Sequence, residues 1–188
     1  MPNQIDFAFL SSLEGGSQTD GYVPAAATSR SGVTIATGFD LGQRNESDLT
    51  RLGLPQALIA QLKPYLGMQG TAAHQYLLQH PLTVTRHETT RIDRAVKAEH
   101  VARLERKFLA SAANMQRAAF FSLPPEAQTV IASVSFQYGV NLDIRTPRFW
   151  RAVTAQDWAQ AVKELRMFGD AYPTRSQREA DLLQRIVP

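Results

Sequence analysis

Hydrophobic positions near the start of the chain follow the spacing of one helix face. Apolar side chains recur at helical intervals over residues 4–14, and Gly15 and Gly16 follow as a helix-ending signal. The pattern predicts a helix over residues 4–14 whose last residue is Glu14.

Short β-type segments replace the helical pattern between residues 19 and 41. The segments 21–23 and 33–37 favour strands, and the small polar residues 28–32 between them suit a turn. This stretch predicts a small antiparallel hairpin.

Helical signals dominate from residue 46 to the end of the chain. Thr85 and Glu88 match a capping box, in which the Thr85 hydroxyl accepts from the amide of Glu88 and the Glu88 carboxylate accepts from the amide of Thr85. A long helix is therefore expected to begin at Thr85. Further helices are expected from Pro124 to Gly139, around Trp158, and from about Thr174 onward.

These elements predict an α+β fold that is mainly α, in a single domain over residues 1–188. An N-terminal lobe over 14–84 would carry the hairpin, a long connecting helix would span 85–109, and an all-helical C-terminal lobe would cover 110–188. The helix at 4–14 would pack near the C-terminal lobe.

Composition limits the chemistry more than the fold. The chain has 44% hydrophobic and 20% charged residues, as ordinary globular proteins do, and a net charge of +3 that fits a polyanionic partner without requiring one. It contains no Cys, so disulfides and thiolate metal sites are excluded. The four histidines follow no metal-binding spacing, so we expect surface histidines, no metal and no cofactor.

The hairpin region offers residues for cutting a glycosidic bond, which needs a protonated carboxylic acid and a second group across the sugar. Glu14 at a helix C-terminus faces the negative end of the helix dipole, which disfavours its ionised form, as a general acid requires. Asp40, six residues after Thr34, could hold a water to which Thr34 hydrogen-bonds. Taken alone, these residues favour ordinary roles: a solvated helix end, a strand residue, and a helix N-cap for Asp40.

A family resemblance changes that balance. Three segments of the first half resemble the catalytic stretch of the pesticin family of lysozyme-like muramidases. They are LEGG at residues 13–16, GYVP at 21–24 and SGVTIATGFDLG at 31–42. In that family a Glu, a Thr and an Asp form the active site, which implies catalytic roles for Glu14, Thr34 and Asp40. The phage enzymes instead carry their Asp in the turn before the strand Thr, where this chain has Thr28 or its neighbours.

The second half resembles phage lysozyme, which implies a lysozyme-like two-lobed fold. The matching segments are ASVSFQYG at residues 132–139, WAQAV at 158–162 and YPTRSQR at 172–178. The resemblance implies that Gln137 contacts substrate and that Arg178 pairs with the catalytic Glu. The alternatives are a helix-end Gln that caps a carbonyl and an Arg on a helix surface.

The resemblance implies a peptidoglycan hydrolase that cuts the β-1,4 bond between N-acetylmuramic acid and N-acetylglucosamine. Inversion of configuration is favoured by family analogy, and retention stays open. We expect a monomer that binds glycan strands, acting as an antibacterial effector, with an immunity protein or a secretion-machine component as partner, or as a phage endolysin.

Localisation follows from the first residues, which lack the basic start of a secretory signal peptide and place Asp6 inside their apolar stretch. The enzyme would be made in the cytoplasm and would act on the cell wall in the periplasm, that of a target cell if it is an effector. Its apolar runs are too short to span a bilayer, so no membrane insertion is expected.

Two other functions compete with this interpretation. Basic residues between Arg86 and Lys107 would suit a small helical nucleic-acid-binding protein, but Glu88, Asp93 and Glu99 alternate with them, which is typical of a solvated helix face. We therefore expect no nucleic-acid partner. A lytic transglycosylase would share the substrate and differ in its product.

Overall fold

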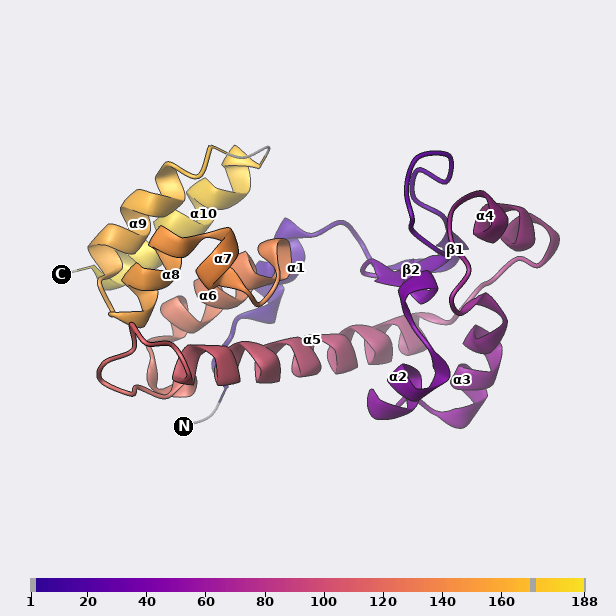
Figure 1. Cartoon of the computed structure of the whole chain (residues 1–188), viewed down its shortest axis with the longest axis horizontal. Helices are drawn as coiled ribbons and strands as arrows, with labels where there is room; N and C mark the ends of the chain where they lie inside the picture. Colours follow the sequence, from indigo (N-terminus) through magenta and orange to yellow (C-terminus); the bar gives the residue numbers. More distant parts are fainter. Residues whose placement is uncertain (1–2, 170–171, 188) are drawn as a thin grey trace. The chain divides into compact units, whose positions relative to one another are not determined.

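A computed structural model describes residues 3–169 and 172–187 of the chain. Within these residues, the contacts divide the chain into two compact units. The sheet unit comprises residues 14–99, and the helical unit comprises the residues up to Leu13 together with those from His100 onward. The boundary between them falls inside the long helix α5 (Arg86–Leu109), which is marked in Figure 1. Its residues up to Glu99 belong to the sheet unit, and those from His100 onward belong to the helical unit.

The sheet unit is built around strands β1 (Gln18–Tyr22), β2 (Thr34–Ala36) and β3 (Phe39–Asp40). In the described part of the chain they form one antiparallel sheet in the order β1-β2-β3. The pairing of β1 with β2 confirms the predicted hairpin. The third strand was not among the predicted elements, and it forms because Ala36 and Gly38, with φ of 50° and 74°, reverse the chain within three residues.

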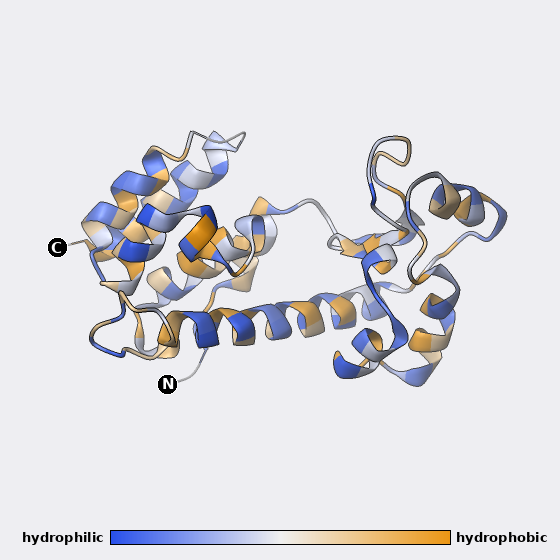
Figure 2. Cartoon of the chain, in the orientation of Figure 1, coloured by the Kyte–Doolittle hydropathy of each residue, from blue (hydrophilic) through white to orange (hydrophobic). Residues whose placement is uncertain are grey.

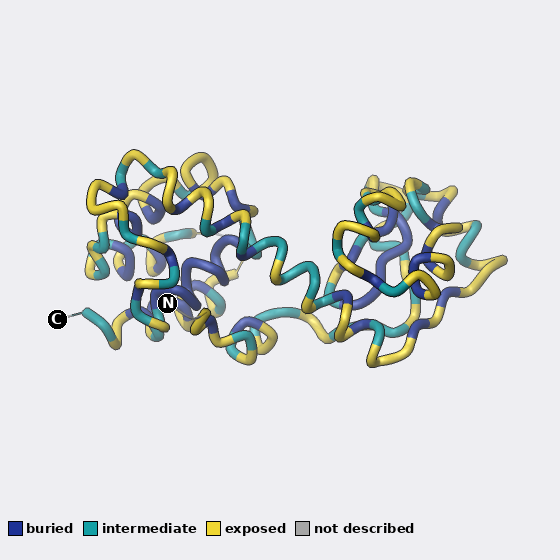
Figure 3. The backbone as a smooth tube through the Cα atoms, turned by 90° about the horizontal axis from the view of Figure 1, so that it is seen from below, coloured by how far each residue is buried: buried dark blue, intermediate teal, exposed yellow. Residues whose placement is uncertain are grey.

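Short helices complete the sheet unit. In chain order they are η1 (Leu41–Gln43), α2 (Glu46–Arg51), α3 (Gln56–Leu62), η2 (Lys63–Tyr65) and α4 (Gly70–Gln79), followed by the first part of α5. Buried apolar residues from the sheet and from these helices form one hydrophobic core, and Figure 3 shows these buried positions enclosed by exposed ones. Val33 and Ile35 contribute from the sheet, Leu58 and Ile59 from α3, and Ile92 from α5.

The predicted capping box at the start of α5 is confirmed. The Thr85 amide donates to Glu88 Oε2 at 2.7 Å, and the Glu88 amide donates to Thr85 Oγ1 at 3.2 Å. Two hydrogen bonds hold the pKa of Glu88 below its ordinary value. The bond from the Thr85 amide has the larger effect, and the bond from the Thr85 hydroxyl has the smaller one. Polar and apolar residues then alternate along the whole of α5 (Figure 2).

The helical unit packs its helices around one apolar core. Its helices are α1 (Phe7–Leu13), η3 (Phe120–Ser122), α6 (Pro125–Tyr138), α7 (Leu142–Arg145), α8 (Pro147–Thr154), α9 (Trp158–Arg166), α10 (Pro173–Leu183) and η4 (Gln184–Ile186). Residues 127–135 of α6 are all buried, so this helix is covered on every side. The predicted α+β class, mainly α, is confirmed, and no helix in the described ranges is long and apolar enough to cross a membrane.

A buried ionic cluster links two helices of this unit. Glu179 on α10 is 1% exposed and accepts from Arg175 Nε at 3.1 Å and from the hydroxyl of Ser133 on α6. Arg175 also donates to the Ser133 carbonyl at 2.9 Å. Each of these buried polar atoms thus has a partner, which offsets the cost of removing the charges from water.

Candidate active site

The hairpin places Thr34 and Asp40 opposite each other. The register of β2 and β3 pairs Thr34 with Asp40 and Ile35 with Phe39. Directly opposed residues of an antiparallel pair share one face, with Cβ atoms about 4.5–5.5 Å apart. Thr34 is buried, and its hydroxyl donates to the Gly32 carbonyl at 3.1 Å. Two residues that are six positions apart in the sequence are therefore direct neighbours across the strands.

Asp40 is held through one oxygen of its carboxylate. Oδ1 accepts from the amide of Gly32 at 2.9 Å and from the amide of Gly42 at 2.8 Å, the latter as the N-cap of η1. The alternative prediction of an N-cap is thus correct for this oxygen. Within the described residues, Oδ2 receives no hydrogen bond from the protein. The carboxylate is oriented by Oδ1 and leaves Oδ2 for a water or a ligand.

Two glycines allow the backbone to close around Asp40. A Cβ atom at Gly32 would lie 2.4 Å from Gly42 Cα and 2.4 Å from the Met68 carbonyl oxygen, and one at Gly42 would lie 2.4 Å from that same oxygen. These contacts are with backbone atoms, so no side chain fits without moving the chain. The amides of both glycines donate to Asp40 Oδ1. The close approach of Gly32 and Gly42 therefore helps to hold the Asp40 carboxylate in place.

We expect Gly42→Ala to destabilise the protein by about 1–3 kcal/mol, the usual cost of overpacking a filled site. Urea unfolding followed by circular dichroism measures this change. Gly15→Ala is the matched control, because a Cβ there meets no atom within 4 Å. Equal unfolding midpoints for the two variants would show that the contact between Gly32 and Gly42 relaxes without cost.

Glu14 directly follows α1, which ends at Leu13, so the prediction that Glu14 is the last helical residue was wrong by one position. Glu14 therefore lies just outside the last helical turn. Its side chain is 16% exposed, and its buried Oε2 has no hydrogen-bond partner among the described residues. Lys97 Nζ of α5 lies 3.7 Å from that oxygen.

The face of α5 toward these segments carries a second charged group, Asp93, one turn before Lys97. Asp93 Oδ1 accepts from the Thr37 amide at 3.0 Å, and Oδ2 accepts from the hydroxyls of Thr37 and Ser17, each at 3.0 Å. The mixed charges of α5 predicted a solvated face. For Asp93 and Lys97 that prediction was wrong, because both are partly buried and contact residues far away in the sequence.

The two remaining candidates lie in the helical unit. Gln137, in the last turn of α6, donates from Nε2 to the Tyr138 hydroxyl at 3.3 Å. Arg178 on α10 donates to Ser12, at 3.4 Å to the carbonyl and 2.9 Å to the hydroxyl, and its guanidinium lies 5.5 Å from the centre of the Phe9 ring. Substrate contact for Gln137 and pairing with Glu14 for Arg178 stay predictions.

The histidines of the described residues form no group that could hold a metal ion. His74, His80 and His87 are exposed, as predicted. His100 is not a simple surface residue, because its ring stacks on Phe136 with centres 4.2 Å apart. Its Nε2 also lies 2.9 Å from the Ser135 hydroxyl.

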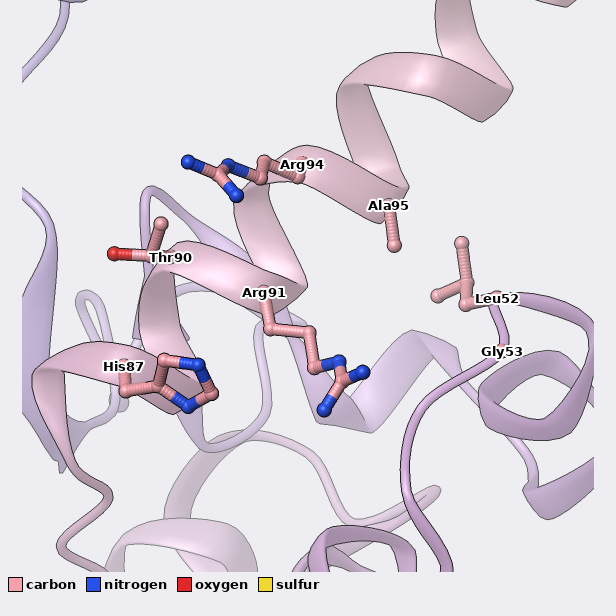
Figure 4. Close-up of a pocket in the computed structure, with 7 residues that line it drawn as sticks. All are labelled: Leu52, Gly53, His87, Thr90, Arg91, Arg94 and Ala95. Carbon is pink, nitrogen blue, oxygen red and sulfur yellow. The ribbon is translucent and has the colours of Figure 1, made fainter.

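A basic cavity of about 410 Å³ lies on another face of α5, lined by Leu52, Gly53, His87, Thr90, Arg91, Arg94 and Ala95. Figure 4 shows the guanidinium groups of Arg91 and Arg94 pointing in different directions. They do not converge on one point, as the groups around a small bound anion do. The candidate catalytic residues are not among those that line this cavity.

Comparison with known families identifies the family of the chain. The profile of one family, described as "Pesticin: Bacterial toxin homologue of phage lysozyme, C-term", matches residues 4–159. The match includes Glu14, Thr34 and Asp40 and stops before Arg178. A search of curated proteins found none that matches the chain. Because the family profile covers most of its length, the chain belongs to the pesticin family of phage-lysozyme homologues.

Proposed function

We propose that this protein is an N-acetylmuramidase that hydrolyses the β-1,4 bond between N-acetylmuramic acid and N-acetylglucosamine in peptidoglycan. Its membership of the pesticin family supports a lysozyme-type muramidase in general. The observation that carries the proposal further is the direct pairing of Thr34 with Asp40 across the hairpin. A hydroxyl and an oriented carboxylate on one face suit the handling of a water molecule.

Glu14 is the general acid in this proposal. A glycosidic oxygen leaves readily only when it receives a proton as the bond breaks, and a carboxylic acid in a partly buried position supplies that proton. The side chain of Glu14 is 16% exposed, and its buried Oε2, 3.7 Å from Lys97 Nζ, accepts no hydrogen bond from the described residues.

Asp40 is the general base, and Thr34 helps to place the water. Asp40 Oδ2, which accepts no hydrogen bond from the described residues, would take a proton from the water as its oxygen attacks the anomeric carbon. The bond to the leaving sugar breaks, and Glu14 protonates that sugar. One water is consumed and one new reducing end is formed. This assignment corresponds to inversion, whereas a direct attack by Asp40 on the sugar would give retention.

Product analysis tests the proposal. Purified protein incubated with peptidoglycan should release fragments whose new reducing end, marked by borohydride reduction, is muramic acid. NMR of the first products should show the α-anomer if the reaction inverts. Anhydro-muramic ends would identify a lytic transglycosylase instead, and intact glycan with cut peptides would contradict both activities.

The proposed setting is the periplasm, with glycan strands as partners of a monomeric enzyme. Delivery as an antibacterial effector and release as a phage endolysin are the two routes by which it would reach the wall. An immunity gene beside its own gene would identify an effector. Nucleic acid is not proposed as a partner, because the guanidinium groups of Arg91 and Arg94 diverge (Figure 4) and Lys97 Nζ lies 3.7 Å from Glu14 Oε2.

A further inference from the structure

We propose that Asp93 is a positioning residue that holds the two chain segments bearing the proposed catalytic groups. The inference rests on the proposed function and concerns a residue that, in the described part of the chain, forms no hydrogen bond or ion pair with those groups. Both oxygens of its carboxylate are engaged, Oδ1 by the Thr37 amide and Oδ2 by the hydroxyls of Thr37 and Ser17. One side chain of α5 thereby fixes two separate loops of the sheet unit.

The first of these loops connects β2 to β3. Thr37 lies between Ala36 and Gly38, whose φ values of 50° and 74° fall in the left-handed region. That region is sterically unfavourable for Ala, so the turn needs support from outside itself. Asp93 supplies it by accepting from both the amide and the hydroxyl of Thr37.

The position of this loop decides how Thr34 and Asp40 face each other. Thr37 is three residues after Thr34 and three before Asp40, at the centre of the connection between the two strands. These strands are short, and their register pairs two residues from each. A shift of the turn would therefore change the distance between the two side chains directly.

The second loop connects Glu14 to β1. Ser17 is three residues after Glu14 and is the last residue before β1. Its hydroxyl donates to Asp93 Oδ2. One turn further along α5, Lys97 lies 3.7 Å from Glu14 Oε2. Two side chains on one face of a single helix thus hold both ends of this short segment. A rigid helix that carries its contacts one turn apart is a suitable support for groups that must stay in register.

Kinetics of peptidoglycan cleavage by full-length variants test this inference. Asp93→Ala removes all three bonds, and we expect kcat to fall by roughly 10- to 100-fold with KM nearly unchanged, the effect of misplacing reacting groups by about 1 Å. Asp93→Asn should retain kcat within about threefold, because its carbonyl still accepts from Thr37 and its amide can donate to the hydroxyls. Glu99→Ala is the control, because it removes another α5 carboxylate, one that pairs with Arg51 at the surface.

The amide of Thr37 gives a second measurement that does not depend on activity. Its hydrogen exchange should accelerate at least tenfold in Asp93→Ala and stay near the wild-type rate in Glu99→Ala. If Asp93→Ala fails to fold, Thr37→Val removes one of the three bonds and should lower kcat by a smaller factor.

Different outcomes separate the two proposals. A wild-type protein without glycan cleavage would overturn the proposed function, while the exchange measurement would still report whether Asp93 holds the loop. A wild-type protein that cleaves glycan, beside a folded Asp93→Ala variant with unchanged kcat, would overturn the positioning role. A lower melting temperature with unchanged kcat would likewise leave Asp93 as a merely structural residue.

Discussion

Glu14→Gln is expected to abolish glycan cleavage while leaving the protein folded. General acid catalysis is typically worth about 10²- to 10⁴-fold in rate, and glutamine has no acidic proton to give to the leaving oxygen. The substitution keeps the shape of the side chain, so its other contacts should persist. The rate of reducing-end formation from peptidoglycan measures the loss, which should bring activity close to the detection limit.

The control for this variant is Glu46→Gln. Glu46 also forms an ion pair with a lysine, Lys63, at 2.8 Å, but both side chains are well exposed, at 46% and 61%. Losing such a surface pair costs about 0–1 kcal/mol and should leave lysis unchanged. For Glu14→Gln we expect a melting temperature at or above that of the wild type, because Oε2 is buried without a hydrogen bond and such groups are often unfavourable to folding. Near-normal lysis by a folded Glu14→Gln protein would show that another group is the acid.

Local patterns were sufficient to predict several elements of this fold. The capping box at Thr85 was predictable because the two bonds join residues three positions apart. The pairing of β1 with β2 followed from two strand-like segments around a polar turn. The third strand was missed because it depends on Ala36 adopting a positive φ, which alanine rarely does and which the sequence does not signal.

The support of the candidate site could not be predicted, because it is made by residues distant in the sequence. Asp93 lies 56 positions after Thr37, and Lys97 is further still from Glu14. Nothing in the spacing of charges along α5 distinguishes these two residues from their exposed neighbours. The requirement for glycine at positions 32 and 42 has the same origin. The backbones of Gly32 and Gly42 come too close for a side chain only after the chain has folded. The candidates Glu14, Thr34 and Asp40 came from the family resemblance.

Asp40→Asn should lower activity by about 10²- to 10³-fold, the range found when a group that stabilises transition-state charge is removed. The structure makes this substitution selective. The asparagine carbonyl can keep the two bonds that Oδ1 accepts from Gly32 and Gly42, so the hairpin and η1 retain their support. What changes is the position of Oδ2, where asparagine has an amide nitrogen that can neither take a proton from water nor carry negative charge.

Comparison with Asp40→Ala and Thr34→Ala separates charge from structure at this pair. Asp40→Ala also removes both accepted bonds, so it should lose activity to the same extent and in addition about 1–3 kcal/mol of unfolding free energy. Thr34→Ala removes one buried hydroxyl, worth about 0.5–1.5 kcal/mol, and should reduce the cleavage rate least. Rates of reducing-end release and urea unfolding curves of the three variants provide the measurement. If Asp40→Asn kept near-wild-type activity while Asp40→Ala lost it, the carboxylate would serve the hairpin through Oδ1 alone, and the base would have to be sought elsewhere.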